Sequence, residues 1–123
     1  MKANLEIMLE HPVMFLSDPY AEDFAPLDIG EKLIASNEDC IAFMVRPYFE
    51  GGADVTISSE NHHTFDLPDF KTGITTQSGT ISLSDSYRFN YLIFPVEGPK
   101  VDVEIWSLDD GGIWVRINSL IEY

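Results

Sequence analysis

The sequence has little cysteine and no long hydrophobic run. Cys40 is the single cysteine among 123 residues, which excludes an internal disulfide and a cysteine-based zinc cage. No stretch approaches the roughly 18 uncharged apolar residues that cross a bilayer. The first residues also lack the small-residue cleavage site of a secretory signal. These absences predict a cytoplasmic protein that does not associate with membranes.

Basic residues are scarce beside the acidic ones. Seven Lys and Arg stand against 21 Asp and Glu, which gives a net charge of −14 at pH 7. A nucleic-acid-binding protein would have to neutralise phosphates with seven dispersed bases, so nucleic acid is disfavoured as a partner. Excess acid provides solubility and a fast, salt-sensitive attraction to basic proteins. The charge therefore favours a basic protein partner, and a plain solvated acidic surface is the alternative.

Residues that carry catalysis or bind metals are also sparse. Neighbouring residues on an extended strand face opposite sides, so His62 and His63 cannot bind one ion from a strand. Only a loop would let them form a weak site with Asp66 and Asp69. Cys40 stands at the start of an apolar strand, where a small buried residue is expected instead of a nucleophile. The sequence thus predicts a protein that is not an enzyme, with no catalytic residues, no metal and no cofactor.

The chain does contain enough apolar material for a core, and this material has a period of two. With 45% hydrophobic and 12% aromatic residues, the chain is predicted to fold, as one domain over 1–123. Polar and apolar residues alternate in stretches of strand length separated by turn signals. With no long helices between them, these stretches predict an antiparallel β-sandwich of about seven or eight strands. The stretches are 5–9, 13–16, 41–46, 53–58, 75–83, 86–94, 101–106 and 113–118.

Local turn and cap signals add detail to this plan. Two hairpins are predicted, 41–46 with 53–58 around Gly51-Gly52, and 101–106 with 113–118 around Asp109-Asp110-Gly111-Gly112. One short helical turn is predicted near 29–35, where apolar residues have helical spacing and Asp28 is placed to cap.

The second hairpin carries one candidate partner-binding surface. If Ile105 and Ile117 point inward, Trp106 faces outward opposite Trp114 or Arg116. Exposed aromatic residues among charges are typical of interaction hot spots. The alternative is that another segment or sheet covers this face, so that both indoles belong to a core. The candidate residues of this hairpin are Asp102, Glu104, Trp106, Asp109, Asp110 and Trp114.

The segment 18–39 is the second candidate surface. It holds seven acidic residues and one basic residue, and it is the longest stretch without strand patterning. Long loops in compact domains are usually functional or mobile. Carboxylates spaced along such a loop would suit the basic groove of a nuclease, and a solvated loop is the alternative. The candidate residues here are Glu22, Asp23, Asp28 and Glu31.

The succession of elements resembles a known family. An early strand ending Phe15-Leu16-Ser17-Asp18 is followed by Ile41-Ala42-Phe43, by Val55-Thr56-Ile57 after a glycine pair, and by a closing two-stranded unit. This order is similar to that of the competence protein J group, inhibitors of a DNA-entry nuclease, and more loosely to that of bacterial immunity proteins. The resemblance implies a β-sandwich that inhibits by stoichiometric binding and uses no catalytic residues.

Charge and resemblance together predict an acidic cytoplasmic inhibitor or immunity protein. Its expected partner is a basic toxin or enzyme, with a nuclease as the leading candidate, and it is expected to be a monomer or homodimer. One alternative is a sugar-binding sandwich module that uses Trp106 and Trp114 as a stacking platform. Another is a structural subunit of a larger assembly.

Overall fold

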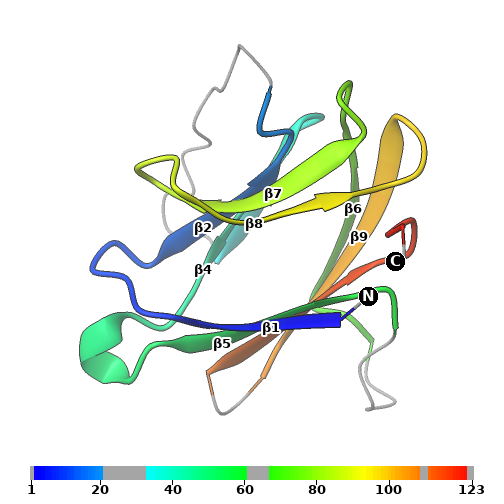
Figure 1. Cartoon of the computed structure of the whole chain (residues 1–123). Helices are drawn as coiled ribbons and strands as arrows, with labels where there is room; N and C mark the ends of the chain where they lie inside the picture. Colours follow the sequence, from blue (N-terminus) through cyan, green and yellow to red (C-terminus); the bar gives the residue numbers. More distant parts are fainter. Residues whose placement is uncertain (1, 21–32, 61–66, 109–110, 122–123) are drawn as a thin grey trace.

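The computed structural model forms two five-stranded β-sheets that pack face to face (Figure 1). It describes residues 2–20, 33–60, 67–108 and 111–121. The first sheet has the order β1 (Lys2–Ile7), β5 (Ala53–Ser58), β10 (Gly112–Ile117), β9 (Lys100–Ser107) and β6 (Phe70–Thr75). The second has the order β3 (Ile34–Ser36), β4 (Cys40–Met44), β2 (Val13–Ser17), β7 (Thr80–Asp85) and β8 (Asn90–Pro95). The predicted β-sandwich is confirmed.

Strand pairing is antiparallel in both sheets except between β5 and β10, which run parallel. A parallel pair cannot be joined by a short hairpin, and β5 and β10 are indeed far apart in the chain. This pairing places β10 between β5 and its own hairpin partner β9, at the centre of the first sheet.

The core lies between the sheets and follows the alternation read from the sequence. In β9 the side chains of Val101, Val103 and Ile105 are buried, whereas Asp102 between them is exposed. Ile117 on β10 is also fully buried, so the inward direction predicted for this hairpin is confirmed. The opposite sheet contributes buried apolar residues of the same kind, among them Met14, Leu16, Ile41, Phe43, Ile81, Leu83 and Phe94.

The hairpin predicted from 41–46 and 53–58 is wrong. β4 pairs with β2 and β3 in the second sheet, whereas β5 pairs with β1 and β10 in the first. A 3-10 helix (Tyr48–Glu50) lies between them, and Gly51 and Gly52 then turn the chain with positive φ angles of 111° and 72°. Two alternating stretches around a glycine pair have the same pattern whether the chain folds back or crosses to the facing sheet, so local periodicity cannot distinguish them.

Several other elements also differ from the prediction. The stretch 75–83 contains the end of β6 and the start of β7, and 86–89 is a loop before β8. The strands β3 and β6 were not predicted, because β3 has three residues and β6 includes Gly73 and two threonines. Of the predicted helical turn at 29–35, Ile34 and Ala35 belong to β3, since they pair with β4, and 29–32 lie outside the described residues.

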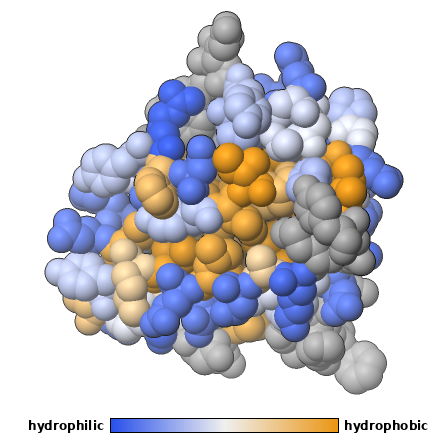
Figure 2. Space-filling model, in the orientation of Figure 1, coloured by the Kyte–Doolittle hydropathy of each residue, from blue (hydrophilic) through white to orange (hydrophobic). Residues whose placement is uncertain are grey.

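The two sheets meet differently along their two edges. At one edge Thr75 of β6 reaches the second sheet, because its N–H and its hydroxyl both donate to the carbonyl oxygen of Glu38, at 2.7 and 3.2 Å. β1 and β8 are the edge strands of their sheets on the other side. Figure 2 shows apolar side chains between hydrophilic rims on this face of the molecule. Among the described helices, none is long and apolar enough to cross a membrane.

Candidate functional site

The two indoles of the closing hairpin lie directly opposite each other and are buried. Trp106 and Trp114 form a cross-strand pair between β9 and β10, and each is 6% exposed. Of the two neighbours predicted for Trp106, Trp114 is therefore the one observed. The sequence left two alternatives open, exposed indoles or indoles covered by another part of the protein. The structure shows the second.

Neighbouring groups hold the Trp114 indole against the outer face of the first sheet. Its Nε1 donates a hydrogen bond to the carbonyl oxygen of Glu60 at 3.0 Å, and the Lys2 ammonium lies 4.9 Å from the ring centroid. Thr56 and Asn4 continue the same row of side chains across β5 and β1, joined by a hydrogen bond of 2.8 Å. The indoles are thus part of a packed layer and are not projecting anchors.

The charged residues of this hairpin have different environments. Glu104 accepts from Arg116 Nη1 at 2.6 Å, and Arg116 Nε also donates to the carbonyl oxygen of Ser59. Glu104 is therefore tied within the fold, whereas Asp102 is exposed to solvent. The candidates Asp109 and Asp110 lie outside the described residues.

The acidic segment is described only at its two ends. Glu22, Asp23, Asp28 and Glu31 lie outside the described residues. At the near end, Asp18 follows β2 and is buried, 7% exposed. At the far end, Asn37 caps the turn before β4 by accepting from the backbone of Asp39 and Cys40, and Asp39 itself accepts from Thr75 Oγ1 at 2.6 Å.

Asp18 is the most extensively hydrogen-bonded carboxylate among the described residues. Its oxygens accept from the hydroxyls of Thr76 and Ser78 at 3.0 and 2.7 Å, and from the backbone N–H groups of Tyr20, Gln77 and Ser78. Burial alone would raise its pKa, but these donors stabilise the charged form and hold the pKa at about 2. All of these donors belong to the protein itself. Asp18 is therefore a structural anchor between β2 and the turn that follows β6.

A small pocket opens beside Asp18. It has a volume of about 40 Å³ and is lined by Ser17, Asp18, Pro19, Ser82, Ser84, Arg88 and Asn90. Pockets for small organic ligands usually enclose about 300 to 1,000 Å³, so this one suits water and not a sugar.

Groups for metal binding or nucleophilic attack do not assemble in the described part of the chain. No cluster of three or more His, Cys, Asp or Glu side chains there could hold a metal ion, and His62, His63 and Asp66 lie outside it. Burial, together with the neighbouring charge of Asp39, raises the pKa of Cys40 to about 12. The Cys40 thiol therefore stays protonated at neutral pH, and the prediction of a buried structural cysteine is confirmed.

Large exposed apolar side chains gather at one end of the sandwich, and the sequence reading missed them. They come from the β1–β2 loop, the end of β4, the 3-10 helix and the β7–β8 loop. The alternating pattern had assigned Tyr87 and Phe89 to a strand, whereas both lie in the loop before β8. We define the aromatic end as Met8, His11, Met44, Tyr48, Phe49, Tyr87 and Phe89.

The chain is similar in structure to the crystal structure of ComJ, inhibitor of the DNA degrading activity of NucA, from Bacillus subtilis. The TM-score is 0.67, and the match covers 95% of each chain at 11% sequence identity. This likeness confirms, at the level of fold, the resemblance to the competence protein J group. No protein-family model matches the chain, and no curated protein matches it.

Proposed function

We propose that this protein is a nuclease inhibitor that acts by binding its target stoichiometrically. The observation that carries the proposal is the shared two-sheet fold, which extends over 95% of both this chain and the nuclease inhibitor ComJ. An inhibitor of this kind needs a complementary surface and no reactive group of its own.

The charge of the chain supports a basic target. A net charge of −14 attracts a basic protein over distances beyond contact and raises the rate of encounter. Nucleases that bind the phosphates of DNA need a positive surface around the active site. An acidic inhibitor that docks there would compete with DNA for the same charges. We place this interaction in the cytoplasm.

The alternative of a sugar-binding module loses its main support. A stacking platform needs the flat faces of Trp106 and Trp114 open to solvent, and both indoles are 6% exposed. The pocket beside Asp18 is also far too small for a sugar ring.

The proposal is tested by titrating a nuclease with this protein. The nuclease is one encoded beside the gene of this chain, because inhibitors and their targets are usually encoded together. We expect plasmid cleavage to fall linearly with added protein and to stop at a fixed molar ratio, with a complex of the same ratio in size-exclusion chromatography.

Two results would contradict the proposal. One is the absence of a complex at micromolar concentrations of both proteins. The other is a stable complex in which plasmid cleavage continues at the rate of the free nuclease.

A further inference from the structure

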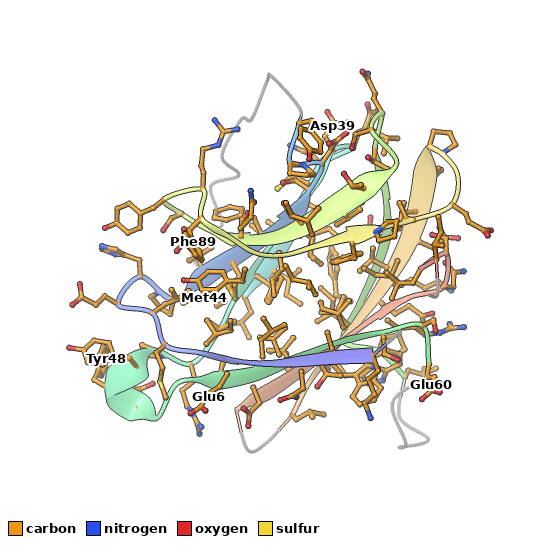
Figure 3. All side chains as sticks on the ribbon, in the orientation of Figure 1. Glu6, Asp39, Met44, Tyr48, Glu60 and Phe89 are labelled. Carbon is orange, nitrogen blue, oxygen red and sulfur yellow. The ribbon has the colours of Figure 1, made fainter. Side chains whose placement is uncertain are left out.

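The aromatic end brings together three loops and a strand end. The backbone N–H of Tyr48 donates to the carbonyl oxygen of Leu9 at 2.9 Å, which joins the 3-10 helix to the β1–β2 loop. The rings of His11 and Tyr87 lie 5.9 Å apart and join that loop to the β7–β8 loop. Figure 3 shows Met44, Tyr48 and Phe89 along this end of the molecule.

The side chains on this surface are much more exposed than apolar residues in a core. Phe49 is 69% exposed, Tyr87 77% and Phe89 60%. Single exposed apolar residues need no explanation, but several gathered at one end of a protein are typical of an interaction site.

The β7–β8 loop is held rigid by the buried carboxylate of Asp85. One oxygen accepts from the backbone N–H groups of Tyr87 and Phe89, at 2.9 and 3.1 Å, and the other accepts from the Tyr91 hydroxyl at 3.0 Å. Arg88 has a φ of 64°, the left-handed conformation that turns the chain between the two exposed rings. Both rings therefore project from a fixed backbone.

The loop that carries Tyr48 and Phe49 is also fixed. Arg46 Nε donates to the carbonyl oxygen of Gly52 at 2.6 Å, and a Cβ at Gly111 would collide with the same guanidinium. Gly51 is left-handed and its N–H donates to the carbonyl oxygen of Tyr48, which closes the turn. A surface that is ordered before binding loses less conformational entropy when a partner docks.

Exposed carboxylates border this surface on the side of β1, the 3-10 helix and β5, and Arg88 is exposed between Tyr87 and Phe89. Glu10 lies in the β1–β2 loop and Glu50 follows Phe49, while Glu6 and Asp54 stand directly opposite each other on β1 and β5. Like charges in a cross-strand pair destabilise a sheet. Within the described part of the chain, none of these four carboxylates has an ion-pair partner. Their charge is therefore available to a positively charged partner.

We propose that the aromatic end, with its surrounding carboxylates, is the surface that docks onto the basic face of the target protein. This inference rests on the proposed function, since the target is the nuclease that the chain inhibits. Phe49, Tyr87 and Phe89 insert as apolar anchors, and Glu10 and Glu50 pair with lysine or arginine side chains of the partner.

The test measures complexes of the nuclease with single variants of the full chain. We expect Phe49→Ala, Tyr87→Ala and Phe89→Ala each to weaken binding at least about tenfold, with melting temperatures unchanged. Glu50→Lys should do the same by placing like charges in contact.

Matched controls lie elsewhere on the surface. Leu67→Ala removes a side chain that is 87% exposed, and Asp102→Lys reverses a carboxylate of the closing hairpin. Wild-type affinity in all three aromatic variants, or an equal loss with Leu67→Ala, would overturn the inference. If the three aromatic variants still inhibit and Asp102→Lys does not, the inference is overturned and the proposed function stands. The interface would then lie on the closing hairpin.

A second measurement does not depend on the nuclease. Isotope-labelled protein is titrated with a synthetic peptide of alternating lysine and tryptophan, and shifts of the backbone amide signals are recorded. We expect the largest shifts in residues 8–11, 48–51 and 86–89. Largest shifts elsewhere, or no binding at millimolar peptide, would overturn the inference even if the nuclease fails to bind.

Discussion

At the scale of single residues, polar side chains with full hydrogen bonding fix the turns of this sandwich. Asp18 joins the end of β2 to the turn after β6, and Asp85 performs the same task between β7 and β8. From the sequence, neither residue was predicted to anchor a turn. Nothing in the local pattern separates a carboxylate that accepts five hydrogen bonds from one that faces water, because four of the five bonds to Asp18 come from residues 58 to 60 positions away.

Replacing Asp18 with Asn should destabilise the fold by about 2 to 3 kcal/mol at pH 7. The amide keeps the size of the carboxylate but loses charge-assisted bonds and turns a donor toward donors. Because folding lowers the pKa of Asp18 from 3.8 to about 2, its charge contributes stability above pH 3.8, and this contribution disappears as the pH falls through about 2.

Urea unfolding of the wild type and of Asp18→Asn between pH 7 and pH 2 measures this effect. The difference in unfolding free energy should shrink by about 2 kcal/mol toward low pH. The exposed Asp102→Asn serves as control and should show no such trend. A difference that stays constant over this range would contradict the role given to the Asp18 charge.

Trp114 should contribute to stability and not to binding. Because the indole is buried and its Nε1 is hydrogen-bonded to Glu60, Trp114→Ala should cost about 3 to 5 kcal/mol of unfolding free energy. Acrylamide should quench the tryptophan fluorescence of the folded protein far less than that of the urea-unfolded chain. Equal quenching in both states would show that the indoles are open to solvent.

At the scale of elements, the sequence predicted β9 and β10 well and the link from β4 to β5 badly. Both members of the β9–β10 pair have an aliphatic residue at every second position, and the Gly-containing turn between them is short, so local signals predict the pairing. The 46–52 segment also carries glycine, yet its course depends on Arg46, which reaches Gly52 and Gly111. Contacts of that range leave no periodic trace in the sequence.

The inward faces of the closing hairpin can be tested by introducing charge. Val103 and Ile117 are fully buried opposite each other, so Val103→Asp or Ile117→Asp should unfold the protein. An unpaired carboxylate in the core costs several kcal/mol, against a total stability of about 5 to 15 kcal/mol for such a domain. Circular dichroism during heating reports the loss.

Asp102→Ala on the same strand is the matched control, because Asp102 faces solvent. It should melt within a few degrees of the wild type. A Val103→Asp variant with a wild-type melting temperature would mean that the two faces of β9 are assigned in reverse.

At the scale of the whole molecule, composition predicts the kind of partner but not the docking surface. The net charge of −14 follows from the sequence alone, and it supports a basic target protein. The surface itself depends on three loops that are distant along the chain and that the two folded sheets bring together. Aromatic residues in the β7–β8 loop, Tyr87 and Phe89, resemble strand residues when only periodicity is considered.

Association with a basic partner should slow as salt rises from about 0.05 to 0.5 M, because the Debye length falls from roughly 14 Å to about 4 Å. Stopped-flow measurement of the association rate constant checks this, and the dissociation rate should change much less. Glu10→Gln and Glu50→Gln together should flatten the dependence on salt more than Glu97→Gln does, since only the first two carboxylates border the aromatic end. A tight complex whose association rate is independent of salt would remove electrostatic steering as the reason for the acidic surplus. The affinity would then have to come from contacts between the exposed aromatic rings and the target, with no contribution from long-range electrostatic attraction.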